Sequence, residues 1–210
     1  DTVRLGASNQ ISDTSMVTVN SSGVFDLNGQ TESISALEGS SGASITLGAG
    51  TLNLTGSTQT VFDGVFSGSG TINKSGTGKF SLSANSAGLS GAVNLSGGII
   101  NLSGTAANML GTGTVSVSGA GNLELQGGAS LGNALSLNSN GTGANDGALQ
   151  NVAGNNTISG AVTLAGDSRV QSDAGTLTFS NTVGLGANTL NVGGSGSTAV
   201  SAVISGTGGL

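Results

Sequence analysis

The sequence predicts an all-β fold, a single-stranded parallel β-helix (β-solenoid) with almost no α-helix. Three observations predict it: a nine-residue phrase recurs along the chain, apolar and polar residues alternate within that phrase, and the copies are spaced by about one circuit of a small solenoid. No amphipathic stripe with the helical period extends beyond one turn.

The repeated phrase combines a glycine bend with a short strand. Its six copies are GAGTLNLTG (48–56), GTGKFSLSA (76–84), SGGIINLSG (96–104), GAGNLELQG (119–127), DAGTLTFSN (173–181) and GANTLNVGG (186–194). The third position is glycine or asparagine, the residues that best tolerate positive φ, so we expect a bend there. The fifth and seventh positions are apolar and face the core, whereas the polar sixth position, which includes Asn53 and Asn101, is expected to face solvent.

Further short strands are expected between these copies. A second phrase occurs as SGAVNL (90–95) and SGAVTL (159–164), with GTGTVSVSG (111–119) as a relative. Alternating apolar residues predict additional strands at Met16–Val19, Val24–Leu27, Ile34–Leu37, Ile45–Leu47 and Leu135–Leu137.

The spacing of the copies selects the architecture. Successive copies of the first phrase begin at Gly48, Gly76, Ser96, Gly119, Asp173 and Gly186. The first three intervals each fit one coil of the solenoid, the fourth is long enough for two coils, and the short last interval places the final two copies on adjacent faces of one coil. We therefore expect nine or ten coils in one continuous solenoid over residues 1–210, with each copy stacked on the next. A β-sandwich would carry longer strands, more core aromatics and more hairpin dipeptides.

Composition excludes several classes of function. The net charge is −6, and the four cations Arg4, Lys74, Lys79 and Arg169 are too widely separated to follow a phosphate backbone, so we expect no nucleic acid partner. No apolar run approaches the ~20 residues that cross a bilayer, so direct membrane insertion is not expected. The absence of cysteine has two interpretations: a composition dominated by Ser, Gly and Asn, or export through a pore that a disulfide would block.

Most of the chain resembles the passenger repeats of bacterial autotransporters, the type V secreted surface proteins. The resemblance covers RLGASNQISDTSMVTVN and its continuation (4–37), VFSGSGTINKSGTGKFSLSANSAGLSGAVNLSGGIINL (65–102), which is similar to the passenger-associated transport repeat, and residues 148–194, which resemble an autotransporter-associated β-strand repeat. It departs from the family at Asn85, Ser86 and Ala87, where these repeats often carry tyrosine, so an aromatic binding site is not expected.

The resemblance implies a right-handed β-helical passenger, exported to the extracellular face of the outer membrane through a C-terminal barrel that the sequence here does not contain. Members of the family serve as adhesins, aggregation factors, stalks and carriers of enzyme domains. The chain starts without a signal peptide, and neither end has a capping helix or charged segment, so we expect a piece of a longer repetitive chain.

No catalytic, cofactor-binding or metal-binding residue is predicted. The sequence has neither histidine nor cysteine, which removes the usual bases, thiol nucleophiles and zinc ligands. Asp167, Arg169 and Asp173 form the closest charged group, either a surface ion pair or, if the two carboxylates meet at neighbouring bends, a cation site. GTGANDGAL (141–149) lacks the repeated form of a calcium-binding nonapeptide and is expected to be a plain loop. GTGKF (76–80) lacks the spacer and helix of a phosphate loop and is expected to be a repeat bend.

Three functions remain open. The leading expectation is a structural or adhesive rod of a secreted bacterial surface protein, which binds a host or neighbouring-cell ligand. The first alternative is a subunit that self-associates into an extracellular filament or sheath. The second is a carbohydrate-active enzyme, which needs paired carboxylates; Glu32 with Glu38, or Asp26 with Glu32, supply a pair only if the coils bring them together. Without Trp or Tyr to stack on sugar rings, we expect no enzyme.

Overall fold

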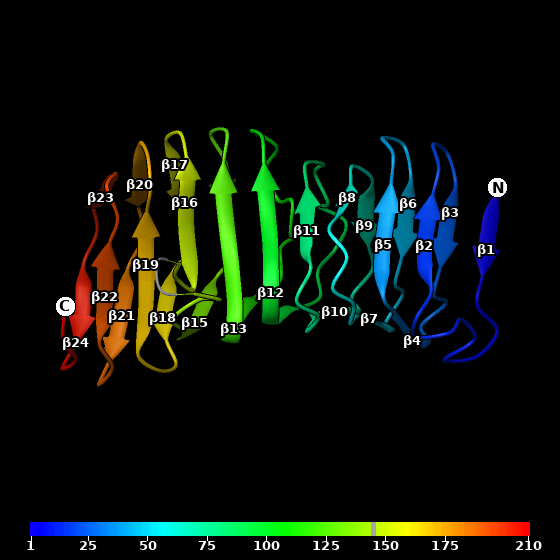
Figure 1. The fold of residues 1–210 in the computed structure, drawn as a ribbon, viewed down its shortest axis with the longest axis horizontal. Helices are drawn as coiled ribbons and strands as arrows, with labels where there is room; N and C mark the ends of the chain where they lie inside the picture. Colours follow the sequence, from blue (N-terminus) through cyan, green and yellow to red (C-terminus); the bar gives the residue numbers. More distant parts are fainter. Residues whose placement is uncertain (144–145) are drawn as a thin grey trace.

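The computed structural model describes residues 1–143 and 146–210 and confirms the predicted fold class. Within these residues every regular element is a β-strand, and every strand pair is parallel. The strands stack side by side along the long axis, and the colour changes steadily from the N-terminal to the C-terminal end (Figure 1). About ten coils are stacked in this way.

The strands form three ladders along the three sides of the solenoid; most coils contribute to each ladder, but the middle coils have no strand in ladder 3. Ladder 1 contains β4 (Thr31–Ile34), β7 (Thr51–Leu54), β10 (Thr71–Lys74), the first part of β12 (Val93–Ser103), the first part of β13 (Val115–Gln126), β15 (Leu135–Ser139), β18 (Val162–Leu164), β21 (Val183–Gly186) and β24 (Ile204–Gly206). Ladder 2 contains β2 (Met16–Val19), β5 (Ala36–Gly39), β8 (Thr60–Phe62), β11 (Lys79–Leu82), the second parts of β12 and β13, β16 (Leu149–Ala153), β19 (Ser168–Ser172) and β22 (Leu190–Gly193).

Ladder 3 consists of two four-stranded sheets. The first is β1 (Thr2–Arg4), β3 (Val24–Asp26), β6 (Ser44–Thr46) and β9 (Val65–Ser67), and the second is β14 (Ser130–Leu131), β17 (Asn156–Ile158), β20 (Thr176–Phe179) and β23 (Ser197–Val200). A single bridge between Gly68 and Leu89 follows the first sheet. Because β12 and β13 run through the bend between ladders 1 and 2, these two ladders form one continuous sheet.

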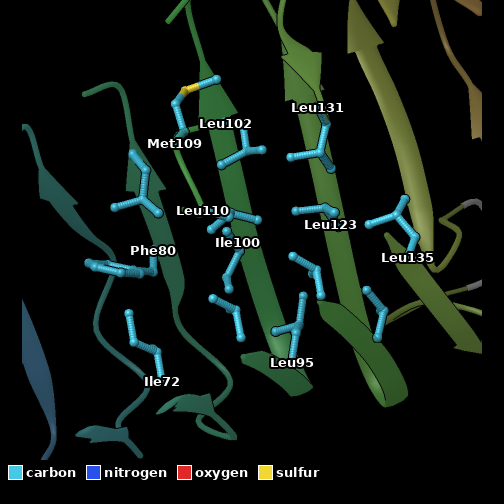
Figure 2. Packing of buried hydrophobic residues seen from close by; sticks show 14 of the residues in the cluster. Ile72, Phe80, Leu95, Ile100, Leu102, Met109, Leu110, Leu123, Leu131 and Leu135 are labelled. Carbon is cyan, nitrogen blue, oxygen red and sulfur yellow. The ribbon is translucent and has the colours of Figure 1, made fainter. Parts of the chain in front are cut away.

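The core is built from like residues stacked between coils. In ladder 2 the inward row pairs Phe80 with Ile100 and Ile100 with Leu123, and all three side chains are almost completely buried. Figure 2 shows these side chains directed into the interior beside Leu95 and Leu135 of ladder 1. Strands of adjacent coils lie about 4.8 Å apart, so each apolar side chain covers the next one.

The six copies of the first phrase do not form one column. The copies with Phe80, Ile100 and Leu123 stack on one another in ladder 2, as expected. The first copy, however, lies in ladder 1, where Leu52 pairs with Ile72 and Glu32. The last two copies lie in β20 of ladder 3 and β22 of ladder 2, so the prediction that they occupy different faces of one coil is confirmed. The phrase therefore encodes a bend and a strand without specifying the face.

The expected positive φ at the third position of the phrase is only partly observed. Gly98 and Gly175 have positive φ, but in three other copies the positive φ lies two residues earlier, at Gly48, Gly119 and Gly186. Gly50 is required for a different reason: a Cβ there would lie 2.2 Å from the carbonyl oxygen of the preceding coil. Close approach between backbones, and not φ alone, selects glycine at this position.

One local expectation is corrected at a bend. The strand expected at Ile34–Leu37 is divided at Ser35, because Ile34 ends β4 in ladder 1 and Ala36 begins β5 in ladder 2. In addition, buried side-chain amides stabilise bends through hydrogen bonds to the backbone, which the apolar pattern of the sequence did not predict. Asn133, for example, donates to the carbonyl oxygens of Leu110, Gly111 and Gly113 in the preceding coil.

Candidate functional site

The outer side of ladder 2 carries half of the charged residues within strands, namely Glu38, Lys79, Glu124 and Arg169. Its central outward row contains one residue per coil, because side chains alternate between the two faces of a strand. In chain order the row is Thr18, Glu38, Val61, Ser81, Asn101, Glu124, Gln150 and Gln171. Short side chains occupy much of the first half of this row, and long polar ones fill the second half.

In the second half of the row the polar side chains bind one another. The Nζ of Lys79 lies 2.5 Å from Oε2 of Glu124, two coils away, and the same oxygen accepts a hydrogen bond from Nδ2 of Asn101 at 3.0 Å. Further on, Nε2 of Gln150 donates to Oδ2 of Asp173 at 2.6 Å, and Nε2 of Gln171 donates to Oδ1 of Asp173 at 3.1 Å. These contacts cover the strands in this part of ladder 2 with a layer of hydrogen-bonded polar side chains, so no groove is left there.

This network corrects the expectation that the polar position of the phrase faces solvent. Asn53 is only half-buried, but Asn101 is 2% exposed and Glu124 is 7% exposed. Side chains from adjacent coils are separated by about the strand spacing of 4.8 Å, so long polar groups cover one another while they exchange hydrogen bonds.

In the first half of the row the surface is open, and a groove of about 520 Å³ lies over four successive coils. It is lined by Thr18, Glu38, Gly39, Ser40, Gln59, Thr60, Val61, Asp63, Lys79 and Ser81. The groove exists because Thr18 and Ser81 are short, and because β5 and β8 pair only at Gly39 and Phe62. It is the clearest candidate for a binding site on the described surface.

The groove is lined by two carboxylates and by one cation, Lys79, which is paired elsewhere. Glu38 has no hydrogen bond or ion pair within the part of the chain that the structure describes. Oδ1 of Asp63 accepts a hydrogen bond from the Ser83 hydroxyl. Lys79 extends along the groove wall, but its ammonium group binds Glu124 outside the groove. The groove is therefore locally acidic.

The carboxylate pairs proposed from the sequence are not brought together. Asp26 lies in ladder 3 and forms an ion pair with Arg4, with Nε and Oδ2 3.2 Å apart. Glu32 occupies an inward position of ladder 1 and is completely buried, whereas Glu38 faces outward from ladder 2. Because the three carboxylates belong to three different sides of the solenoid, neither pair can act on one substrate.

The group formed by Asp167, Arg169 and Asp173 is linked mainly through amides. Nη2 of Arg169 donates to Oε1 of Gln171, and Gln171 in turn donates to Asp173. Asp167 instead accepts a hydrogen bond from the backbone N–H of Thr189. The described residues contain no group of three or more acidic, histidine or cysteine side chains arranged to hold a metal ion.

The two remaining motifs have simple structural roles. In GTGKF (76–80), Gly78 lies against the backbone of the preceding coil and Lys79 forms the ion pair with Glu124. The segment 141–149 includes residues 144 and 145, which lie outside the described residues, and Thr142 donates to Asp146 near its start. Across residues 1–143 and 146–210, no helix has the length and apolar character needed to cross a membrane.

Two buried charges in ladder 1 were not anticipated from the sequence. Lys74 takes an inward position between Leu54 and Leu95, and its Nζ donates to the carbonyl oxygens of Gly76 and, at 3.4 Å, Gly97. Burial lowers the pKa of Lys74 from 10.5 to about 8, because desolvation disfavours the ammonium form. Alignment of TLNL (51–54) with TINK (71–74) would have shown a lysine at a core position.

Glu32 is the second buried charge, near the N-terminal end of ladder 1, and it also binds backbone groups. Its Oε2 accepts a hydrogen bond from the backbone N–H of Gln10 at 2.9 Å, and its Oε1 accepts one from Ile11 at 3.3 Å. The carboxylate thus holds a segment that precedes β4 and does not form a strand there. Its role is to satisfy backbone donors.

Comparisons of this chain with protein-family models, curated proteins and solved structures found no match.

Proposed function

We propose that this chain is a structural and adhesive β-solenoid segment of a secreted bacterial surface protein, with a passenger stalk of the autotransporter type as the nearest description. The observation that supports this proposal best is the continuity of the stacked ladders, which makes a rod of about ten coils. Along the described residues, apolar side chains fill most of the interior of this rod.

The mechanism of such a segment is presentation. Each coil adds about 4.8 Å to the rod, so ten coils separate two ends by roughly 45 Å. Extension of the same rod would place binding elements at a distance from the cell, and coil-by-coil folding outside the cell would favour outward transport. The resemblance of residues 65–102 to a transport repeat supports this interpretation.

The proposal is tested by display of the whole chain on a non-adherent bacterium through an outer-membrane anchor. We expect antibody to label the chain on intact cells, and the cells to settle or attach to host-cell layers faster than cells that carry the anchor alone. Surface-labelled cells with unchanged settling and attachment would contradict the adhesive function.

Self-association is a second candidate, favoured by the outer side of ladder 1. Its central row contains no charged residue in nine successive coils; the row is Ser33, Asn53, Asn73, Asn94, Ser116, Ser136, Thr163, Gly184 and Ser205. A flat side without like-charge repulsion can pack against a second copy. Light scattering over a concentration series tests this candidate, and a strict monomer at high concentration would exclude the filament.

We propose no catalytic role for the chain. A carbohydrate-active enzyme needs two carboxylates that converge on one bond, and the pairs proposed from the sequence lie on separate sides of the solenoid. Glu38 and Asp63 do share the groove, but its lining residues include no aromatic side chain that could stack on a sugar ring. Assay of the purified chain against a panel of polysaccharides provides the check, and any turnover that depends on Glu38 or Asp63 would overturn this part of the proposal.

A further inference from the structure

The groove on ladder 2 has the dimensions of a site for an extended chain. Thr18, Glu38, Val61 and Ser81 occupy one outward row in four successive coils. Three strand spacings of about 4.8 Å give the groove a length of roughly 14 Å along the rod. A four-residue peptide in extended conformation, at about 3.3 Å per residue, has the same length.

The described residues leave the groove with more carboxylates than free cations, so a positive charge on a partner complements it. Lys79 is already neutralised by Glu124, and Arg4 is paired with Asp26 on ladder 3. Lys74 is buried in the core, and Arg169 lies much further along ladder 2, in β19. Glu38 consequently keeps a half-buried carboxylate without a partner among the described residues, next to Asp63 in the same groove.

The groove also offers apolar surface next to these carboxylates. Val61 follows Glu38 in the outward row and is 52% exposed, which is unusual for a valine at the centre of a strand. Lysine and arginine side chains combine an alkyl stem with a charged end, so they can cover an apolar residue while the charged group reaches a carboxylate. Gln59 and Thr18 add polar groups that can bind a peptide backbone.

We propose that this groove binds an extended peptide segment that carries lysine or arginine, supplied by a partner protein. The cationic group lies against Glu38 and Asp63, and the alkyl stem lies on Val61. This inference rests on the proposed adhesive function and names the chemical class of surface that the rod contacts.

The test uses the purified chain and a tetralysine peptide blocked at both ends, with binding measured by calorimetry at low ionic strength. The same peptide with its four amines acetylated is the control probe. We expect binding of the charged peptide only, and Glu38→Gln or Asp63→Asn to weaken it about fivefold each, the effect of one charge pair at about 4 Å in water. Asp26→Asn, which removes the same charge from ladder 3, leaves the affinity unchanged.

A fourth variant, compared with Asp26→Asn, which removes the same charge, tests whether Lys79 can compete with the peptide for the groove. Glu124 does not line the groove, but Glu124→Gln releases Lys79, whose ammonium group then competes for Glu38 and Asp63. We expect this variant to bind the peptide less tightly, with circular dichroism confirming that it is folded.

The inference is overturned if the acetylated peptide binds equally well, or if Asp26→Asn weakens binding as much as Glu38→Gln. Its failure is distinct from failure of the proposed function. If cells that display the chain adhere but the purified chain does not bind tetralysine, the adhesive function stands and this class of partner is excluded.

Discussion

Replacement of Lys74 by methionine tests whether the buried lysine opposes folding at neutral pH. Burial lowers the pKa of Lys74 from 10.5 to about 8. Between these two values the unfolded chain binds one more proton than the folded chain, so the free energy of unfolding rises with pH across this window. Below about pH 8 the folded state carries the full penalty of a buried ammonium, and above about pH 10.5 the penalty is gone.

The magnitude follows from the size of the pKa change. At about 1.4 kcal/mol per pH unit, the shift from 10.5 to about 8 corresponds to about 3 kcal/mol. Methionine has no charge, but it also leaves the carbonyl oxygens of Gly76 and Gly97 without their donor, at a cost of about 1 kcal/mol for each hydrogen bond. The variant should therefore be about 1 kcal/mol more stable than the parent near neutral pH and about 2 kcal/mol less stable at high pH.

Urea denaturation followed by far-UV circular dichroism measures this difference, since the chain has neither Trp nor Tyr for fluorescence. Measurements at several values from about pH 7 to pH 11 should show the two stability curves crossing. Ile72→Met, at the other inward position of β10, is the matched control and should shift stability by the same amount at every pH. Parallel curves for the parent and Lys74→Met would refute the reasoning.

Four further substitutions, one of them a control, test the stacking of the coils by urea denaturation. Phe62→Ala should cost about 3–5 kcal/mol, because it removes a completely buried ring, and a cost under about 1 kcal/mol would contradict close packing. Gly50→Ala should destabilise strongly because its Cβ would lie 2.2 Å from a backbone oxygen, whereas Gly209→Ala, with 3.6 Å to its nearest neighbour, should be nearly neutral. Asn73→Ala should cost about 1 kcal/mol, since Asn73 both donates and accepts in the amide ladder of the outer side of ladder 1, and an unchanged midpoint would show that this ladder adds nothing.

The fold class could be predicted because its main determinants are local. A glycine bend followed by alternating apolar residues specifies a short strand with one buried side, and its regular recurrence at about the length of one coil specifies stacking. The face on which each copy lies could not be predicted, because the same phrase serves ladders 1, 2 and 3. That choice depends on the number of residues in the intervening bends.

The candidate groove could not be predicted because it depends on register between coils. The coil that leads from β5 to β8 contains more residues than the coil that leads from β8 to β11. Glu38 and Val61 are neighbours only because of this difference in coil length. A count that is wrong by one residue moves a side chain from the outer surface to the core. The buried position of Lys74 was, by contrast, available from the sequence once the neighbouring strands were aligned in register.

The coil with the most residues between successive strands of ladder 1 shows where this scaffold tolerates additional residues. Val115 pairs with Leu135, Leu135 pairs with Val162, and Val162 pairs with Val183, so the ladder keeps its register although the middle step is clearly longer than the steps on either side. The additional residues lie between the end of β15 and the start of β16, and the neighbouring coils keep their places. A peptide epitope or a fluorescent label can therefore be inserted between these two strands, and whole coils are the units in which the rod can be lengthened or shortened.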